Sequence, residues 1–286
     1  MEREIVYSMT EAVCSNKQPI LWASTIRIVA TLLIYIVHFA VLSHYNITLV
    51  IDKIAISLFL FIAGFFAVSN LSSTRWIIKR IISIYIPYWP IIITALIANH
   101  IIEYKPSNFL KDFIIFIGGS MFVEDPVYII SWFISLIMLF YLFIFILRNI
   151  SNKLLIALYI STAFYFFNFY LEIHYMYFPA FLAGYTIHLF LKKKNQFAPI
   201  NIFSSNIIFH NKNFYNKLNN YLFDLQNYCY SFFLLHGGVL WILIKYFKIN
   251  GFLAFILGLC FTSTLSFIHY NISRKIITFV STKILK

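Results

Sequence analysis

The sequence predicts an all-α, polytopic membrane protein built as a bundle of transmembrane helices. Of its 286 residues, 61% are hydrophobic and 11% are charged, and the mean hydropathy is +0.82. Globular proteins are about 45–50% apolar and about 25% charged. Apolar segments of roughly 20 residues, the length that crosses a bilayer, also recur along the chain between short polar connections. Little of the chain is left for a soluble domain.

Eight segments are apolar and long enough to be expected to span the membrane. They are 20–42, 51–70, 81–102, 128–147, 154–171, 175–191, 229–247 and 251–271. A ninth apolar run, 109–122, is short and carries Lys111 and Asp112. We therefore expect it to be a re-entrant or interfacial piece rather than a span.

The distribution of basic residues predicts the orientation of the bundle. If the N-terminus is cytoplasmic, most of the 22 lysines and arginines fall on the cytoplasmic side, as the positive-inside rule requires. Residues 1–19 are then a cytoplasmic segment without the apolar core of a signal peptide. A single transmembrane domain follows at 20–271, with a cytoplasmic loop at 192–228 and a cytoplasmic tail at 272–286. For the loop, an amphipathic helix on the inner leaflet and a solvated connector both remain open.

Charge and cysteine usage exclude other classes of protein. The net charge is +12, but the basic residues lie in short loops between apolar segments, which indicates membrane topology rather than nucleic-acid binding. The three cysteines, Cys14, Cys229 and Cys260, show neither a CxxC motif nor zinc-ligand spacing. We expect no disulfide framework and no metal.

The first predicted span contains Arg27 and His38. Eleven residues are about three helical turns, so the two side chains share one face, roughly 16 Å apart. An arginine inside a span costs roughly 2.5–3.5 kcal/mol on insertion scales, which indicates a buried partner or a water-filled cavity. Arg27, towards the cytoplasm, suits an anion such as a phosphate, and His38, towards the exterior, can take a proton from a hydroxyl. Alternatively, Arg27 snorkels inward and His38 caps the outer interface.

Two further segments carry structural signals. In 57–70, Ala63 and Gly64 are small residues among phenylalanines, which favours close helix packing. In 79–89, a basic edge leads into an aromatic helix that Pro87 is expected to kink. Lys79 and Arg80 are ordinary positive-inside residues or contacts for a cytoplasmic phosphate.

Six motifs in order resemble the membrane-bound acyltransferase family 3, the bacterial O-acyltransferases of cell-surface glycans. The Arg27/His38 pair resembles the Arg-x10-His signature, and Ser57–Asn70 resembles the FFxxSGF helix. Lys79–Trp89 is similar to KRxxRIYxPYW. Ser131-Trp132-Phe133 through Tyr141 is similar to the WFL…Y helix, Phe181–Tyr185 to FxxGY, and Tyr230–His236 to SYSxYLxH.

The resemblance implies an enzyme of the bacterial inner membrane with ten or so helices, so that eight to ten are expected here. Such an enzyme moves an acyl group, usually acetyl, from cytoplasmic acyl-CoA to a hydroxyl of a surface polysaccharide, such as O-antigen or capsule, or of a lipid-linked sugar. The acyl-CoA is a co-substrate, and no bound cofactor is implied. Arg27 and His38 match the essential pair. The expected substrate-binding residues are Lys79, Arg80, Tyr85, Trp132, Tyr141, Ser231 and His236.

Departures from the family pattern keep other hypotheses open. Many members carry a glutamate where this chain has Ile137, and the third arginine of KRxxR is Ser83. A catalytically inactive member is therefore one alternative, and an exporter of a glycan or acylated sugar, with Arg27 and His38 along its path, is another. His236, expected about seven residues into its span and near the depth of Arg27, is either a packing residue or a site residue. Likewise Ser231 is either an interhelical hydrogen-bond donor or a ligand contact, and Trp132 either an interface anchor or a sugar-stacking ring.

Overall fold

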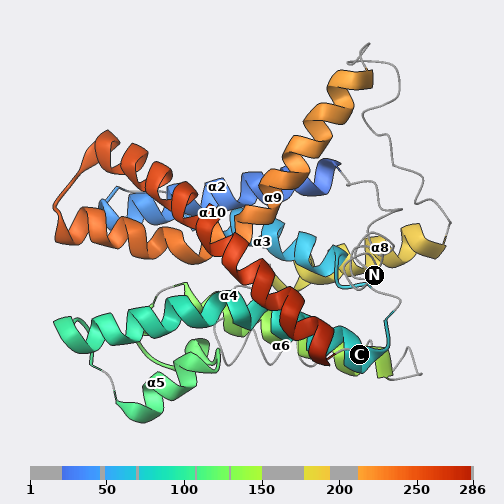
Figure 1. Ribbon diagram of the computed structural model, residues 1–286, viewed down its shortest axis with the longest axis horizontal. Helices are drawn as coiled ribbons and strands as arrows, with labels where there is room; N and C mark the ends of the chain where they lie inside the picture. Colours follow the sequence, from blue (N-terminus) through green and yellow to red (C-terminus); the bar gives the residue numbers. More distant parts are fainter. Residues whose placement is uncertain are drawn as a thin grey trace, which may run out of the picture.

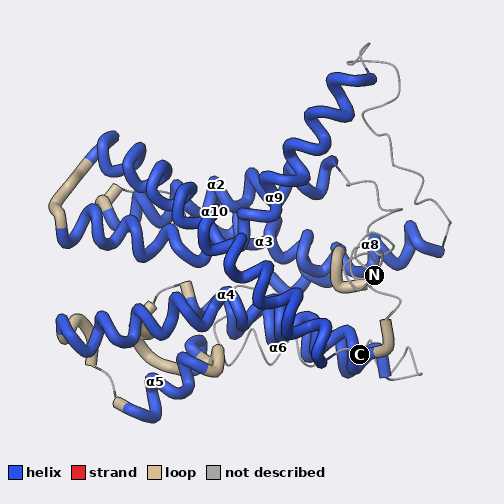
Figure 2. Tube along the Cα trace, in the orientation of Figure 1, coloured by secondary structure: helices blue, strands red, loops and turns tan. Residues whose placement is uncertain are grey.

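The computed structural model describes residues 21–45, 49–68, 71–106, 108–128, 130–149, 177–193 and 212–284. Every regular element in these ranges is a helix (Figures 1 and 2), which confirms the all-α prediction. In chain order the elements are α2 (Leu21–Leu42), α3 (Leu49–Phe65), α4 (Ser73–Ile102), α5 (Phe109–Phe116), the 3₁₀ turn η1 (Ser120–Phe122), α6 (Ser131–Asn149), α8 (Tyr177–Lys193), α9 (Lys212–Trp241), the π-helical turn η2 (Ile242–Tyr246) and α10 (Gly251–Ile284).

Within the described residues, four helices are long and apolar enough to cross a membrane. They are 22–42, 73–102, 220–246 and 251–284, and each contains most or all of one predicted span. Helices α3, α6 and α8 are shorter and occupy three further predicted spans, while the predicted span 154–171 lies outside the described residues. The protein is thus a multi-pass membrane protein, and the total of eight spans and the cytoplasmic termini stay predictions.

Two helices are longer than the sequence predicted. Helix α9 begins at Lys212 rather than near 229, and α10 continues to Ile284 rather than ending near 271. The polar residues at these ends are not apolar enough to be counted as a span, but no proline or glycine interrupts 212–236 or 259–284, so the helix propagates past the apolar segment. In Figure 1, the first turns of α9 project away from the bundle, and α10 crosses from α9 to α4.

Helices α3 and α8 touch backbone to backbone through two glycines. A Cβ atom at Gly64 would lie 1.9 Å from the carbonyl oxygen of Phe181, and one at Gly184 would lie 2.0 Å from that of Phe61. A residue larger than glycine would clash with the facing backbone at either position. Small residues allow helix backbones to approach this closely. The expected close packing at Gly64 is confirmed, and its partner is the backbone of Phe181, the first residue of the FLAGY motif.

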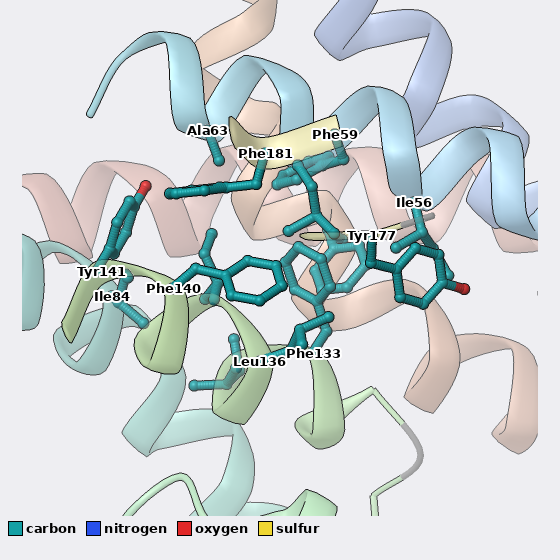
Figure 3. Close-up of a cluster of buried hydrophobic side chains, with 14 of the residues drawn as sticks. Ile56, Phe59, Ala63, Ile84, Phe133, Leu136, Phe140, Tyr141, Tyr177 and Phe181 are labelled. Carbon is teal, nitrogen blue, oxygen red and sulfur yellow. The ribbon is translucent and has the colours of Figure 1, made fainter. Parts of the chain in front are cut away.

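Aromatic side chains fill the space between α3, α6 and α8 (Figure 3). Phe59 meets Phe133 edge to face at a ring-centroid distance of 5.3 Å, and Phe140 lies 5.1 Å from Phe181. All four are buried, and such ring pairs stabilise beyond their buried area. This core fixes α3, which on its other side packs against α2, the helix that carries the candidate site.

The segment 109–122 folds as the eight-residue α5 followed by the turn η1. Eight residues span only about 12 Å, less than the ~30 Å hydrocarbon core, so α5 is not a spanning helix, as expected. The hydroxyls of Tyr85 and Tyr88 on α4 each donate a hydrogen bond of 2.6 Å, to the carbonyls of Ile117 and Ile115 respectively. Helix α5 is therefore fastened to α4 through backbone carbonyls.

Candidate active site

Helix α2 carries both Arg27 and His38 in one unbroken helix, as the sequence predicted. They are eleven residues apart, which places them roughly 16 Å apart along one face. Helix α2 packs against α3 and α9, and these neighbours determine what each of the two side chains meets. The two ends of this face form separate environments.

At one end, His38 forms a pair with His236 of α9. Nδ1 of His38 lies 2.6 Å from Nε2 of His236, and the two ring centroids are 4.9 Å apart with an angle of 21° between the ring planes. His236 is 1% exposed, and its Nδ1 lies 3.2 Å from the carbonyl oxygen of Phe232. The expectation that His236 lies near the depth of Arg27 is wrong: α9 starts earlier than predicted, so His236 sits further along the helix, beside His38.

At the other end, Arg27 belongs to an arginine cluster, which we define as Arg27, Arg80 and Arg148 with the rings of Phe66, Trp76 and Tyr141. The Arg27 guanidinium lies over the Phe66 ring at 5.3 Å. That of Arg80 lies over Tyr141 at 5.2 Å and Trp76 at 5.8 Å, and that of Arg148 over Trp76 at 5.2 Å. Arg80 also donates to the carbonyl of Phe66. Three helices, α2, α4 and α6, thus contribute one cation each.

Two members of the arginine cluster, Arg27 and Arg80, bring positive charge that no carboxylate neutralises. Among the described residues neither forms an ion pair, and the ion pairs His100–Asp112 and Lys105–Asp125 lie elsewhere. Aromatic faces stabilise guanidinium groups by about 0.5–2 kcal/mol each, which offsets only part of the cost of gathering them. The cluster therefore suits an anion with several acceptor oxygens, such as a phosphate.

Arg148 is a member of the arginine cluster that the sequence did not indicate as a site residue. It ends the apolar helix α6 and looks like an ordinary positive-inside residue. In the structure its Nη2 donates to the carbonyl of Leu71 at 2.5 Å. Lys79, grouped with Arg80 in the sequence, is exposed and lies outside the cluster.

The other expected substrate-binding residues make packing contacts between helices. Tyr141 lies in the arginine cluster, but Tyr85 binds the carbonyl of Ile117 and Trp132 stacks on Tyr177 at 6.2 Å. The Ser231 hydroxyl lies 2.9 Å from Nδ1 of His269, whose Nε2 donates to the carbonyl of Pro87 at 3.0 Å. The structure therefore brings together Arg27, Arg80 and Tyr141, and separately His38 and His236, but not all of the expected set.

Tyr128, in the connection before α6, contacts α9 beside His236 and was not indicated by any motif. Its buried hydroxyl donates to the carbonyl of Leu234 and accepts from the amide of Gly238 at 3.3 Å. These are the two groups that an α-helix joins to each other, so Tyr128 holds α9 on both sides of His236.

These features define a multi-pass membrane protein. The arginine cluster lies at one end of α2, and the His38–His236 pair lies at the other end. A sequence model of the acyltransferase domain matches residues 20–215, more than half of the chain. The chain belongs to the membrane acyltransferase family 3, and acyl transfer is its class of activity. No curated protein and no solved structure matches the chain significantly. No group of three or more His, Cys, Asp or Glu residues is placed to hold a metal ion in the described part of the chain.

Proposed function

We propose that the protein is an O-acyltransferase of the bacterial inner membrane that moves an acyl group, acetyl by preference, from cytoplasmic acyl-CoA to a hydroxyl of a surface polysaccharide or lipid-linked sugar. The observation that carries the proposal is that α2 has a cationic group at one end of a face and an imidazole pair at the other end. One end of the helix carries Arg27, which has no carboxylate partner among the described residues, and the other end carries His38, which is hydrogen-bonded to the buried His236.

The arginine cluster supports an acyl-CoA as donor. Coenzyme A carries phosphate groups, and arginine presents a fixed fork of donors that matches phosphate oxygens. The Arg27 side chain forms no hydrogen bond to any described residue, which leaves its donors for a ligand. The pantetheine arm separates the phosphates of coenzyme A from its thioester, so an anchor at Arg27 is compatible with reaction further along α2.

His38 supports transfer to a hydroxyl. Its ring removes the proton from the acceptor hydroxyl while the oxygen attacks the acyl carbon. A C–O bond forms, the C–S bond breaks, and the sulfur leaves with the electron pair. The imidazolium then returns the proton to the thiolate, which releases coenzyme A as the free thiol and leaves His38 neutral.

Transfer is tested with purified protein in liposomes, labelled acetyl-CoA and a glycan acceptor. The proposal expects label to move from the thioester to the acceptor, and expects Arg27→Ala and His38→Ala to abolish this while both variants still insert into the membrane. Mass spectrometry of surface glycan from cells with and without the gene should differ by one acyl unit. Normal acylation in either variant would refute the assigned roles.

The same assay separates the two alternatives. An exporter would move a labelled glycan across the liposome membrane and leave acetyl-CoA intact. An inactive family member would do neither. The substitution at Ile137 supports the inactive alternative, and the Arg27/His38 pair counts against it.

A further inference from the structure

We propose that His236 is a positioning residue that fixes the tautomer of His38, so that Nε2 of His38 is the nitrogen that accepts the proton of the acceptor hydroxyl. The proposal deepens the proposed function and rests on it for the origin of that proton. His236 lies beyond residues 20–215, which the family comparison matches. The motif resemblance implied only that His236 binds substrate, and its positioning role is inferred from the geometry.

The first step is the proton on Nδ1 of His236. This nitrogen lies 3.2 Å from the carbonyl oxygen of Phe232, and a carbonyl can only accept. Nδ1 of His236 therefore carries a hydrogen. The ring cannot easily flip, because it stacks at 6.2 Å and 12° on Phe232 and lies against Phe233 and Tyr35 at 5.8 Å and 6.2 Å.

The second step is the charge of His236. The residue is 1% exposed, and no carboxylate in the described part of the chain hydrogen-bonds to His236 or His38. An unpaired buried charge is strongly disfavoured, so the His236 ring is neutral at rest. His38 is only partly buried, but a charge on its ring would lie within a membrane-spanning helix beside a neutral imidazole, which is also costly, so we take both rings as neutral at rest. A neutral imidazole carries one N–H, and since that hydrogen is on Nδ1, Nε2 of His236 has a lone pair.

The third step is the proton between the two rings. The 2.6 Å separation of His38 Nδ1 and His236 Nε2 requires one hydrogen between them. Because Nε2 of His236 has none, Nδ1 of His38 donates. Nε2 of His38 then holds a lone pair, and within the described residues it has no hydrogen-bond partner.

The consequence is a base whose reactive nitrogen is set before the substrate arrives. When Nε2 of His38 takes the hydroxyl proton, the new positive charge is shared along the Nδ1–H···Nε2 bond to His236, and a charge-assisted bond is stronger than a neutral one. A buried aspartate orients the histidine of serine proteases in the same sense. Here the orienting group is a neutral imidazole, and both rings are neutral again after the thiolate is protonated.

The experiment uses the full chain in lipid nanodiscs, labelled with ¹⁵N-histidine and studied by solid-state NMR without substrates. His38 is assigned by the signal lost in His38→Gln. We expect an unprotonated Nε2 on His38, a protonated Nδ1, and a coupling across the hydrogen bond to Nε2 of His236. A protonated Nε2 on His38, or no coupling between the two rings, would overturn the proposal on the wild-type protein alone.

Turnover of three variants provides the second arm. His236→Leu removes the acceptor, and we expect kcat to fall about 10–100-fold, within the roughly 10²–10⁴-fold that a general base supplies, with KM for acyl-CoA unchanged. His236→Gln puts a carbonyl oxygen near the position of Nε2 and should recover most of kcat. His269→Leu, the matched control, removes a partly buried imidazole that does not touch His38 and should leave the His38 spectrum unchanged.

The outcomes separate this inference from the proposed function. If the wild-type protein transfers acyl groups and His236→Leu keeps the wild-type kcat, the inference fails and the proposed function stands. If the wild-type protein transfers no acyl group, the proposed function fails, and the spectrum of the resting protein still decides the tautomer.

Discussion

Two partly buried histidines of the bundle, His269 and His38, show how the surroundings of a residue decide what it can do. His269 uses both ring nitrogens, one towards Ser231 and the other towards the carbonyl of Pro87, and so holds α10 to α9 and α4. His38 uses one nitrogen, towards His236. A ring with both nitrogens engaged has no lone pair for substrate, so the two residues are predicted to respond differently to the same substitution.

We predict that His38→Ala abolishes measurable acyl transfer, a loss of about 10²–10⁴-fold or more, since that is what a general base contributes, without lowering thermal stability in detergent by more than a few degrees. His269→Ala should lower thermal stability and leave acyl transfer largely intact. It leaves buried partners without hydrogen bonds at a cost of about 1–3 kcal/mol, and it touches no reacting atom. Transfer rates and melting temperatures of both variants, measured side by side, test this contrast. It is wrong if His269→Ala is the less active of the two.

Tyr128 is predicted to hold the backbone of α9 around His236. Tyr128→Phe removes the hydroxyl that joins the Leu234 carbonyl and the Gly238 amide, at a cost of about 1–3 kcal/mol for a buried group left unsatisfied. Hydrogen exchange followed by mass spectrometry should show faster exchange in α9 near 234–238. Tyr104→Phe, at a tyrosine that is 51% exposed, is the control and should leave that exchange unchanged.

At the scale of the helix, the sequence predicts where elements exist better than where they end. Apolar length identified α2, α4, α9 and α10, because twenty apolar residues have few alternatives to a spanning helix. It missed the first turns of α9 and the last of α10, because polar residues can continue a helix that a membrane segment has already nucleated. That error in α9 is also why the sequence placed His236 at the wrong depth.

The contact between α3 and α8 yields a prediction at this scale. Gly64→Ala and Gly184→Ala each place a Cβ about 2 Å from a carbonyl oxygen of the facing helix and so force the backbones apart. Overpacking costs typically 1–3 kcal/mol, and here the clash is with backbone that cannot rotate away. Both variants should have a lower melting temperature in detergent than the wild-type protein. On size-exclusion chromatography they should elute in part as larger, partly unfolded species.

Gly251→Asn is the control for these glycines. Gly251 has φ +63° and nothing within 4 Å of a Cβ atom, and asparagine tolerates the left-handed region. If this variant is destabilised as much as Gly64→Ala, close helix approach is not the reason for the glycines of α3 and α8.

At the scale of the whole molecule, the candidate site is an assembly that no single stretch of sequence contains. The face of α2 was predictable, because Arg27 and His38 are eleven residues apart in one helix. Arg80 and His236 were expected as site residues from the motif resemblance, and Arg148 was not. Which of them meets Arg27 and which meets His38 was not predictable, since they come from three other helices and their meeting depends on how those helices pack. Lys79 and Arg80 are neighbours in the sequence, but only Arg80 faces the cluster.

This assembly predicts that the two ends of α2 affect different kinetic constants. Arg80→Gln should raise KM for acyl-CoA roughly 10-fold or more, as expected when a charged hydrogen bond of about 1.5–3 kcal/mol is lost. Arg80→Lys should recover only part of it, because lysine lacks the planar fork. His38→Ala should instead lower kcat at saturating donor.

Lys79→Gln is the control, because it removes a neighbouring but exposed charge. It should change neither KM nor kcat more than about twofold, since exposed charges contribute little. A fall in kcat for Arg80→Gln at unchanged KM would mean that the arginine cluster does not hold the donor.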